Sequence, residues 1–257
     1  MTSANAIAKP TLKPAFSYKV DTSASYLVKG WFAPGQISLI FGASNVGKTF
    51  FCTDLAYHVY TGEVWNGCRV KQGKVLYIAT EGHSCFDKRM EAIKRSRGVP
   101  QNVDEDDWLV LLHKINLHCS EAVAALDKLL EGHCFDLVII DTLAMALGAG
   151  SENENTTYNA VLRHLSIFRK AGNTHVMLVH HPGKDQSRGA RVHSSLQAAV
   201  DTEVLLKSED GRVAVTVTKQ RDHGREQKLF YALDEVVLGE DQEGDPITSC
   251  VVRFLEH

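Results

Sequence analysis

The sequence has no C-x-x-C pair, and its six cysteines and twelve histidines show no metal-ligand spacing. We therefore expect buried, reduced thiols rather than a metal site or a disulfide framework. No apolar run approaches the ~18 residues that span a bilayer, and no basic-then-apolar signal pattern stands at the start. These absences predict a cytoplasmic protein with no membrane partner.

A strong charge of either sign is also missing, because the formal net charge is -3 over 257 residues. Any contact with nucleic acid must therefore come from local basic clusters. The composition is that of an ordinary globular chain. We expect one domain over residues 21–254, and we exclude residues 255–257 as a possible vector-derived tail. Residues 1–20 lack a hydrophobic face and predict a flexible arm, with a subunit clasp as the alternative.

Short β-rich apolar runs alternate with helical patterns after the arm, which is typical of a parallel sheet covered on both faces. The expected central strands are 37–41, 75–79, 109–112, 137–141 and 176–180. Apolar residues at three- and four-residue spacing predict helices over 49–61, 84–97, 120–130 and 156–171. After residue 200 the pattern alternates, which favours an antiparallel extension closed by residues 247–254. The predicted fold is α/β, doubly wound and mainly parallel.

Gly42-x-x-x-x-Gly47-Lys48-Thr49 stands between the first expected strand and the first expected helix. Glycines let backbone N–H groups converge on one point, where the helix N-terminus adds its positive dipole end, so this pattern holds a nucleoside triphosphate by its phosphates. Lys48 would reach the β and γ oxygens, and the Thr49 hydroxyl would bind Mg²⁺. The expected nucleotide-binding residues are Gly42, Ala43, Ser44, Asn45, Val46, Gly47, Lys48, Thr49 and Phe50.

Two further expected strands end in an acidic residue or just before one. Asp141 ends an apolar strand at the edge where a doubly wound sheet binds its ligand, so we expect it to hold the metal with Thr49. Glu81 follows the strand 75–79, and a carboxylate there can orient and polarise a water for attack on the γ-phosphorus. We therefore expect Glu81 to be catalytic, with a solvated loop acid as the alternative.

The order of these blocks resembles the RecA-like ATPases, and among them the small hexameric replicative helicases of the plasmid RepA type and their phage relatives. The similarity runs from about Tyr26 to Phe254. The blocks that carry it are Tyr-Leu-Val-Lys-Gly-Trp at 26–31, Ala-Thr-Glu-Gly at 79–82, Ile-Ile-Asp-Thr at 139–142, Leu-Val-His-His-Pro at 178–182 and Lys-Gln-Arg-Asp at 219–222.

The resemblance implies that a polar residue after the 176–180 strand senses the γ-phosphate. By position this is His181, with His180 beside it, and only one of the two can face the nucleotide. It also implies that Lys219 and Arg221 reach across a subunit boundary to the neighbour's γ-phosphate. For His180 and His181 the alternatives are two ordinary strand-end histidines or a metal-binding pair. For Lys219 and Arg221 the alternative is a pair of solvated surface charges.

In the resembled family, the segment that follows the sensor lines a central channel. Residues 182–195 are rich in Gly, Ser and basic residues, and Lys184, Arg188 and Arg191 against Asp185 give them a local positive charge. We expect backbone contacts to single-stranded DNA with little sequence preference, since no aromatic residue is available for stacking. A flexible solvated lid is the alternative.

Together these features predict a Mg-ATP-hydrolysing ring, most readily a hexamer, that moves along single-stranded DNA as a replicative helicase. Its other partners would be replication or recombination proteins. Three other functions remain open: a recombination or strand-annealing ATPase, a nucleotide-gated scaffold without motor activity, and a small-molecule kinase. The last is the least favoured, because no arginine-rich lid is evident and Glu81 suits activation of water.

Overall fold

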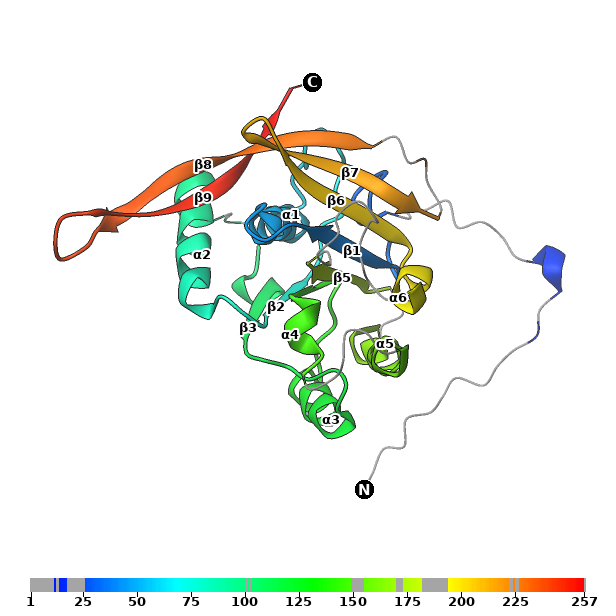
Figure 1. Ribbon diagram of the computed structural model, residues 1–257. Helices are drawn as coiled ribbons and strands as arrows, with labels where there is room; N and C mark the ends of the chain where they lie inside the picture. Colours follow the sequence, from blue (N-terminus) through cyan, green and yellow to red (C-terminus); the bar gives the residue numbers. More distant parts are fainter. Residues whose placement is uncertain are drawn as a thin grey trace.

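A nine-stranded sheet forms the centre of the described part of the chain, with strand order β3-β2-β4-β5-β1-β6-β7-β8-β9 (Figure 1). The computed structural model describes residues 12, 14–17, 26–99, 101, 103–148, 155–169, 173–181, 194–221, 224 and 227–256. The strands are β1 Ile37–Gly42, β2 Val75–Ala79, β3 Trp108–Leu112, β4 Leu137–Asp141, β5 His175–His180, β6 Thr202–Glu209, β7 Arg212–Gln220, β8 Lys228–Glu240 and β9 Pro246–Leu255.

Strands β3, β2, β4, β5, β1 and β6 pair in parallel, and β6 to β9 pair antiparallel. Every residue of β1, β2, β4 and β5 is buried, as continuous apolar strands covered on both faces require. The carboxyl ends of these four strands meet at one edge of the sheet. The loops that leave this edge carry the residues expected to bind a nucleotide.

Helices cover both faces of the sheet. Helices α1 Lys48–Thr61 and α2 His83–Arg97 pack on one face, while α3 Ser120–Leu129, α4 Leu143–Ala146, α5 Asn155–His164 and α6 Ser194–Ala199 cover the other (Figure 1). Three short 3-10 helices complete the described elements: η1 Ala15–Ser17, η2 Glu105–Asp107 and η3 Leu165–Arg169. The fold is thus the doubly wound α/β arrangement that the sequence predicts.

The predicted strands and helices agree with the observed ones to within one or two residues, apart from the end of the 156–171 helix, which continues from α5 as η3. The antiparallel extension expected after residue 200 is also present, since β6, β7, β8 and β9 pair antiparallel. Strand β6 pairs in parallel with β1 on its other side, so it joins the parallel core to the extension. The alternation of residues does not signal this second pairing.

The burial predicted for the cysteines is wrong, because only Cys52 of the six is buried, although all six are unpaired. The arm predicted over residues 1–20 lies mostly outside the described residues. In the part of the chain that the structure describes, no helix has the length and apolar character needed to cross a membrane.

Candidate functional site

The loop between β1 and α1 closes around two glycines that cannot be replaced without strain. Gly47 has φ of 93°, in the left-handed region, and an added Cβ would lie 2.9 Å from the Tyr231 hydroxyl. At Gly42 a Cβ would collide with the backbone carbonyl of Leu206 on the neighbouring β6. These contacts hold the loop against the sheet edge, with the N-terminus of α1 directly behind it.

Lys48 is the first residue of α1 and is only 5% exposed. Its ammonium group donates to the carbonyls of Gly42 and Ala43, both at 2.8 Å, and to Nδ1 of His181 at 3.1 Å. Burial lowers the pKa of Lys48, while the nearby Asp141 opposes this shift. The ammonium group therefore sits inside the loop, where an incoming phosphate would compete with the two carbonyls and the imidazole.

Asp141 ends β4 and accepts two short hydrogen bonds on the same oxygen. The Thr49 hydroxyl donates to its Oδ2 at 2.7 Å, and the hydroxyl of the buried Tyr77 donates at 2.6 Å. Burial raises the pKa of Asp141, and these hydrogen bonds oppose the rise because they favour the carboxylate. A hydroxyl and a carboxylate at one point form the hard oxygen set that suits Mg²⁺, so these residues fit the expected metal.

Glu81 follows β2 and lies beside the same edge. Thr80 fixes the chain just before it, because its N–H donates to the carbonyl of Asp141 at 2.7 Å and its hydroxyl bonds to the backbone of Thr142. The Glu81 carboxylate is half exposed and lies 3.6 Å from Nε2 of His181. Its anchoring to β4 brings a solvent-accessible carboxylate to the mouth of the site.

The two adjacent histidines, the last residue of β5 and the one that follows it, differ in burial and in their contacts. His181 faces α1, with Nδ1 at 3.1 Å from Lys48 and Nε2 at 3.6 Å from Glu81. Since an ammonium group can only donate, Nδ1 accepts and the ring proton lies on Nε2, toward Glu81. His180 is 2% exposed, and burial lowers its pKa to about 4. Of the two, the geometry places His181 at the phosphate loop.

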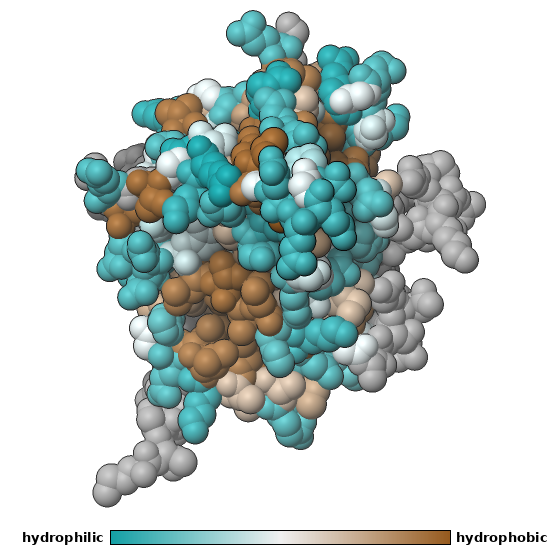
Figure 2. Space-filling model, turned by 90° about the vertical axis from the view of Figure 1, so that its left-hand side faces the viewer, coloured by the Kyte–Doolittle hydropathy of each residue, from teal (hydrophilic) through white to brown (hydrophobic). Residues whose placement is uncertain are grey.

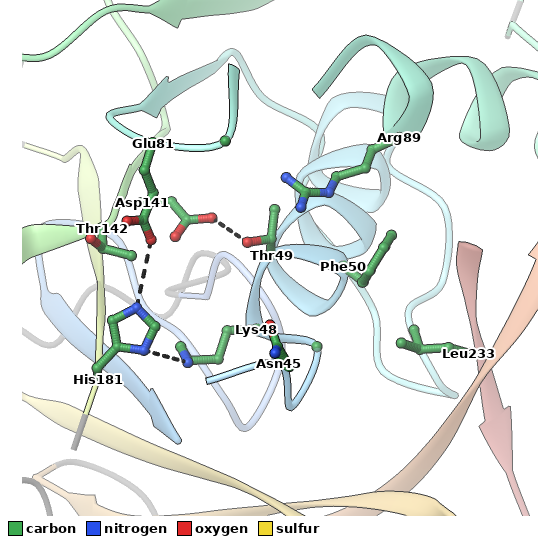
Figure 3. A pocket seen from close by; sticks show the side chains of 12 residues that line it. Asn45, Lys48, Thr49, Phe50, Glu81, Arg89, Asp141, Thr142, His181 and Leu233 are labelled. Atoms are coloured by element: carbon green, nitrogen blue, oxygen red, sulfur yellow. Dashed lines mark hydrogen bonds and ion pairs between the residues drawn. The ribbon is translucent and has the colours of Figure 1, made fainter. Parts of the chain in front are cut away.

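A cavity of about 370 Å³ contains these groups. Figure 3 shows Lys48, His181, Glu81 and Asp141 converging on one side of it, with Phe50, Arg89 and Leu233 on the other. The Arg89 guanidinium of α2 lies 5.3 Å from the centre of the Phe50 ring. The cavity thus has a polar wall suited to phosphates and a wall of mixed aromatic, aliphatic and cationic character.

Lys219 and Arg221 lie outside this cavity, at the opposite end of the sheet. Both contact the C-terminal end of α6, because Lys219 donates to the carbonyls of Gln197 and Val200 at 2.5 and 2.7 Å, and Arg221 pairs with Asp201 at 2.9 Å. Lys219 is the penultimate residue of β7 and Arg221 follows the strand, at the end that pairs with the start of β6, whereas the phosphate loop follows β1 at the other edge. Neither residue lines the cavity of its own chain.

The three basic residues expected to contact DNA, Lys184, Arg188 and Arg191, lie outside the described residues. So does most of the loop between α4 and α5. The structure describes the chain as far as His181 on one side and from α6 on the other. These positions therefore remain predictions from the sequence.

Sequence reasoning did not find four residues that shape the site. In the sequence, Tyr77 looks like an ordinary buried strand residue, and Arg89 looks like one of several cations on a charged helix. Tyr231 and Leu233 look like members of an alternating strand. Their roles depend on distant elements meeting, since β8 carries Tyr231 and Leu233 over the loop that follows β1. No local pattern in the sequence signals this meeting.

Comparisons with known proteins agree with the fold. Residues 6–187 match the protein family described as AAA domain. The crystal structure of the RadB recombinase aligns with a TM-score of 0.56 at 17% identity, covering 79% of this chain and 89% of that one. A stretch of 49 residues is 41% identical to the ABC transporter CDR4 of Candida albicans, but it spans 19% of this chain and 3% of the transporter.

Proposed function

This chain belongs to the AAA domain family and has the fold of the RecA-like P-loop ATPases, and from that premise we propose that it is a Mg-ATP-hydrolysing, ring-forming motor on single-stranded DNA. A replicative helicase is the leading assignment, and residues 21–254 act as one ATPase domain. The observation that carries the proposal is the convergence of Lys48, the Thr49–Asp141 pair and the Glu81–His181 pair on one cavity.

The loop from Gly42 to Thr49 binds the triphosphate, and Lys48 exchanges its carbonyl partners for the β and γ oxygens. Asp141 and Thr49 would hold Mg²⁺, which neutralises charge that develops on the phosphates. Tyr77 would act on the metal indirectly, because its 2.6 Å hydrogen bond fixes the orientation of the Asp141 carboxylate. Phe50, Arg89 and Leu233 form the wall left for the base.

Glu81 serves as the catalytic carboxylate. Its half-exposed oxygen can accept a hydrogen bond from a water at the cavity mouth and orient that water toward the γ-phosphorus. The hydrogen bonds between Thr80 and β4 keep Glu81 near the Asp141 edge. The two carboxylates thus take different roles, since Asp141 is buried and hydrogen-bonded while Glu81 is open to solvent.

His181 links the site to the segment that follows it. In the structure its two ring nitrogens contact Lys48 and Glu81, and the chain continues directly into residue 182. When Lys48 turns to a phosphate, the contact at Nδ1 is lost, so the position of His181 reports whether the phosphate is present. Residues 182–195 then change their grip on DNA through Lys184, Arg188 and Arg191.

A ring is proposed because Lys219 and Arg221 lie at the end of the sheet opposite the phosphate loop. From there they cannot reach the γ-phosphate of a nucleotide bound to the same chain. In a ring they would face the neighbour's site and act on its γ-phosphate, and a finger of this kind raises turnover by ~10³–10⁵. A hexamer is the expected ring.

A recombination ATPase that pairs or anneals strands is the second candidate, because one solved structure that shares the fold is named a recombinase. It would use the same ATP site without unwinding. A forked-duplex assay separates the two: strand separation that needs ATP supports the helicase, and ATP-dependent joining of separated strands supports the recombinase.

The test of the proposal is ATP turnover by the full chain, with and without single-stranded DNA, together with its mass in solution. The proposal expects DNA-stimulated turnover, a multimeric mass and specific activity that rises with protein concentration. Lys48→Ala should abolish turnover. If turnover is unaffected by DNA and the chain stays monomeric, the motor is refuted and a nucleotide-gated scaffold is favoured instead.

A further inference from the structure

Helix α6 ends in carbonyl groups that no further turn of helix satisfies, and two cations from the end of β7 donate to them. The Lys219 ammonium donates to the carbonyls of Gln197 at 2.5 Å and Val200 at 2.7 Å. The Arg221 guanidinium donates to the carbonyl of Ala198. Figure 1 shows α6 beside the start of β6, on the same side of the molecule as the tip of the β7 arrow. The two basic side chains therefore form the C-terminal cap of α6.

Asp201 holds Arg221 from a second direction. Its Oδ1 accepts from the Arg221 guanidinium at 2.9 Å, and its backbone carbonyl accepts from the Arg221 N–H at 3.1 Å. The other carboxylate oxygen, Oδ2, accepts from the N–H of Ile37, the first residue of β1, at 2.9 Å. The Asp201 N–H donates to the Ile37 carbonyl at 2.8 Å. Asp201 is thus fixed to the sheet by its backbone and its side chain, and it fixes the guanidinium in turn.

The two cations differ in how far they are engaged with their own chain. Lys219 is half-buried, and the buried Glu203 lies opposite it in the β6–β7 register. Burial raises the pKa of Glu203, and the charge of Lys219 is among the influences that oppose the rise. The Arg221 side chain is 49% exposed. Among the described residues it bonds to Ala198 and Asp201, which occupy two of the five N–H groups of a guanidinium. Arg221 therefore keeps donors for a partner.

We infer that Asp201 and the last carbonyls of α6 are a positioning device, which holds Arg221 ready for the γ-phosphate bound to the next copy. A guanidinium that is already held at two points loses little freedom when it binds a phosphate, so less free energy is lost in ordering it. Lys219 contributes indirectly, because it closes the end of α6 to which Arg221 is bound. Asp201 is then a positioning residue, and Arg221 is the group that touches the phosphate. The inference rests on the ring in the proposed function.

The two faces that such a contact joins lie on different sides of the molecule. Figure 1 shows α6 and the end of β7 on the side opposite α2. The α2 side has a hollow where hydrophobic side chains gather, lined in part by Met90, Ile93 and Trp108 (Figure 2). Apolar surface of this kind is typical of a face that another protein covers. A head-to-tail contact would place Arg221 beside the α2 side of the next copy, where Arg89 lines the cavity proposed for ATP.

Asp201→Asn tests the positioning role, because asparagine keeps an oxygen for the Ile37 N–H but loses the ion pair with Arg221. ATP turnover by the full chain should fall about tenfold or more, since small displacements of a group that acts on the reacting atoms cost this much. The KM for ATP and the affinity for a non-hydrolysable analogue should change less than about twofold, because only an interaction made in the transition state is lost. Asp201 lies outside the ATP cavity of its own chain.

Two further variants accompany Asp201→Asn. Asp234→Asn breaks an exposed aspartate–arginine pair of 2.6 Å on β8 and is the matched control, with wild-type turnover expected. Asp201→Glu keeps the charge but displaces the guanidinium, so its turnover should lie between those of Asp201→Asn and the wild type. It also serves as the test if the asparagine chain does not fold. Denaturant midpoints should stay close to the wild type, because partly exposed pairs contribute little to stability.

A mixing experiment separates a role toward the neighbour from a local structural role. Lys48→Ala lacks a working ATP site but keeps a held Arg221, whereas Asp201→Asn keeps the ATP site and lacks the held arginine. In randomly mixed rings about a quarter of the junctions combine the two intact halves, so an equal mixture should reach about a quarter of wild-type turnover. Asp201→Asn mixed with the double variant Lys48→Ala/Asp201→Asn should show no gain. Solution mass checks that every variant forms the wild-type multimer.

Unchanged turnover for Asp201→Asn would overturn the inference, and so would a mixture no more active than the average of its parts. Increased turnover would also overturn it, because Asp201 would then restrain Arg221 rather than position it. The proposed function is tested separately. A wild-type chain that stays monomeric, or a fully active Arg221→Gln chain, would refute the contact between copies and the inference with it. A ring that needs Arg221 but not Asp201 would refute the inference alone.

Discussion

At the residue scale, Gly47 shows how one position combines a backbone and a packing requirement. Its left-handed φ favours glycine, and its Cα faces the Tyr231 hydroxyl from β8. Gly67 supplies a natural comparison, because it also has a positive φ, of 77°, but nothing lies within 4 Å of an added Cβ. Alanine substitutions at the two positions therefore distinguish the strain of a left-handed backbone from a steric clash with a neighbour.

Gly47→Ala should destabilise the fold by more than Gly67→Ala, for which left-handed strain alone predicts about 1–2 kcal/mol. It should also weaken binding of an ATP analogue at least about tenfold, since the loop must move to admit the methyl group. Chemical denaturation and calorimetric titration measure the two effects. Equal losses of stability in both variants would show that the contact with Tyr231 is unimportant.

Glu81 and Asp141 differ in exposure, and this difference predicts different effects of substitution. Glu81→Gln should reduce ATP turnover by about 10²–10⁴, the usual contribution of a positioned base, while binding of the nucleotide changes less than about twofold. The measurement is turnover beside analogue affinity, with Glu131→Gln at an exposed position as the matched control. If turnover survives the substitution, another group activates the water.

At the scale of elements, α1 and α2 are joined by a buried charged cluster. Asp54 of α1 is 3% exposed and pairs with Arg97 at the end of α2, while the indole of Trp65 donates to it at 3.0 Å. Arg97 also donates to His58 at 2.9 Å and to the carbonyl of Val252 on β9 at 3.1 Å. Because α2 also carries Arg89, this cluster helps to position one wall of the cavity that contains Lys48 and Asp141.

Removing Arg97 from the Asp54–Arg97 pair should lower the free energy of unfolding. Arg97→Met leaves the Asp54 carboxylate buried without its cation, for which about 3–5 kcal/mol of destabilisation is typical. Burial raises the pKa of Asp54 to about 6 even with Arg97 present, so the carboxyl group will tend to take up a proton in the variant. Denaturant unfolding measures the loss. Asp54→Asn combined with Arg97→Met should recover part of it, and an additive double variant would contradict the pairing.

At the scale of the whole molecule, three buried histidines couple stability to pH. Burial lowers the pKa of His58, His175 and His180 to about 4. In the unfolded chain these three imidazoles take up protons near pH 6.5, whereas in the folded chain they stay neutral down to about pH 4. Their contribution to the free energy of unfolding is therefore fully present above about pH 6.5 and is lost as the pH falls. Asp54, Asp141 and Glu203, whose pKa values burial raises, act in the opposite direction, and Asp54, with a pKa of about 6, already offsets a small part of the histidine effect near pH 6.

The free energy of unfolding should therefore fall by about 2 kcal/mol between about pH 7 and about pH 6, where the histidines dominate. Denaturant titrations at the two pH values measure the change. His175→Gln removes one of the three groups and should reduce the pH dependence by about a third, whatever its effect on total stability. Stability that rises toward pH 6 would contradict the burial of these rings.

The sequence by itself determined the strand and helix positions of the parallel core, and the residues expected to bind ATP could be named from it, although their binding role stays a prediction. These signals are local: apolar runs of strand length, helical spacing, and glycines, a lysine and a threonine at fixed intervals from Gly42 to Thr49. The acids at 81 and 141 could be named as well, because they stand at or just after the ends of expected strands. Their metal and catalytic roles stay predictions.

Only the tertiary structure decided which distant groups meet. It placed the His181 imidazole within hydrogen-bonding distance of Lys48 and buried that of His180, because the position of α1 beside the end of β5 decides which side chain reaches Lys48. It brought Tyr231 and Leu233 of β8 to the site, set β6 parallel to β1, and left an apolar cavity of about 380 Å³ beside β3. Contacts between residues far apart in the chain leave no periodic signal, since they depend on how whole elements pack.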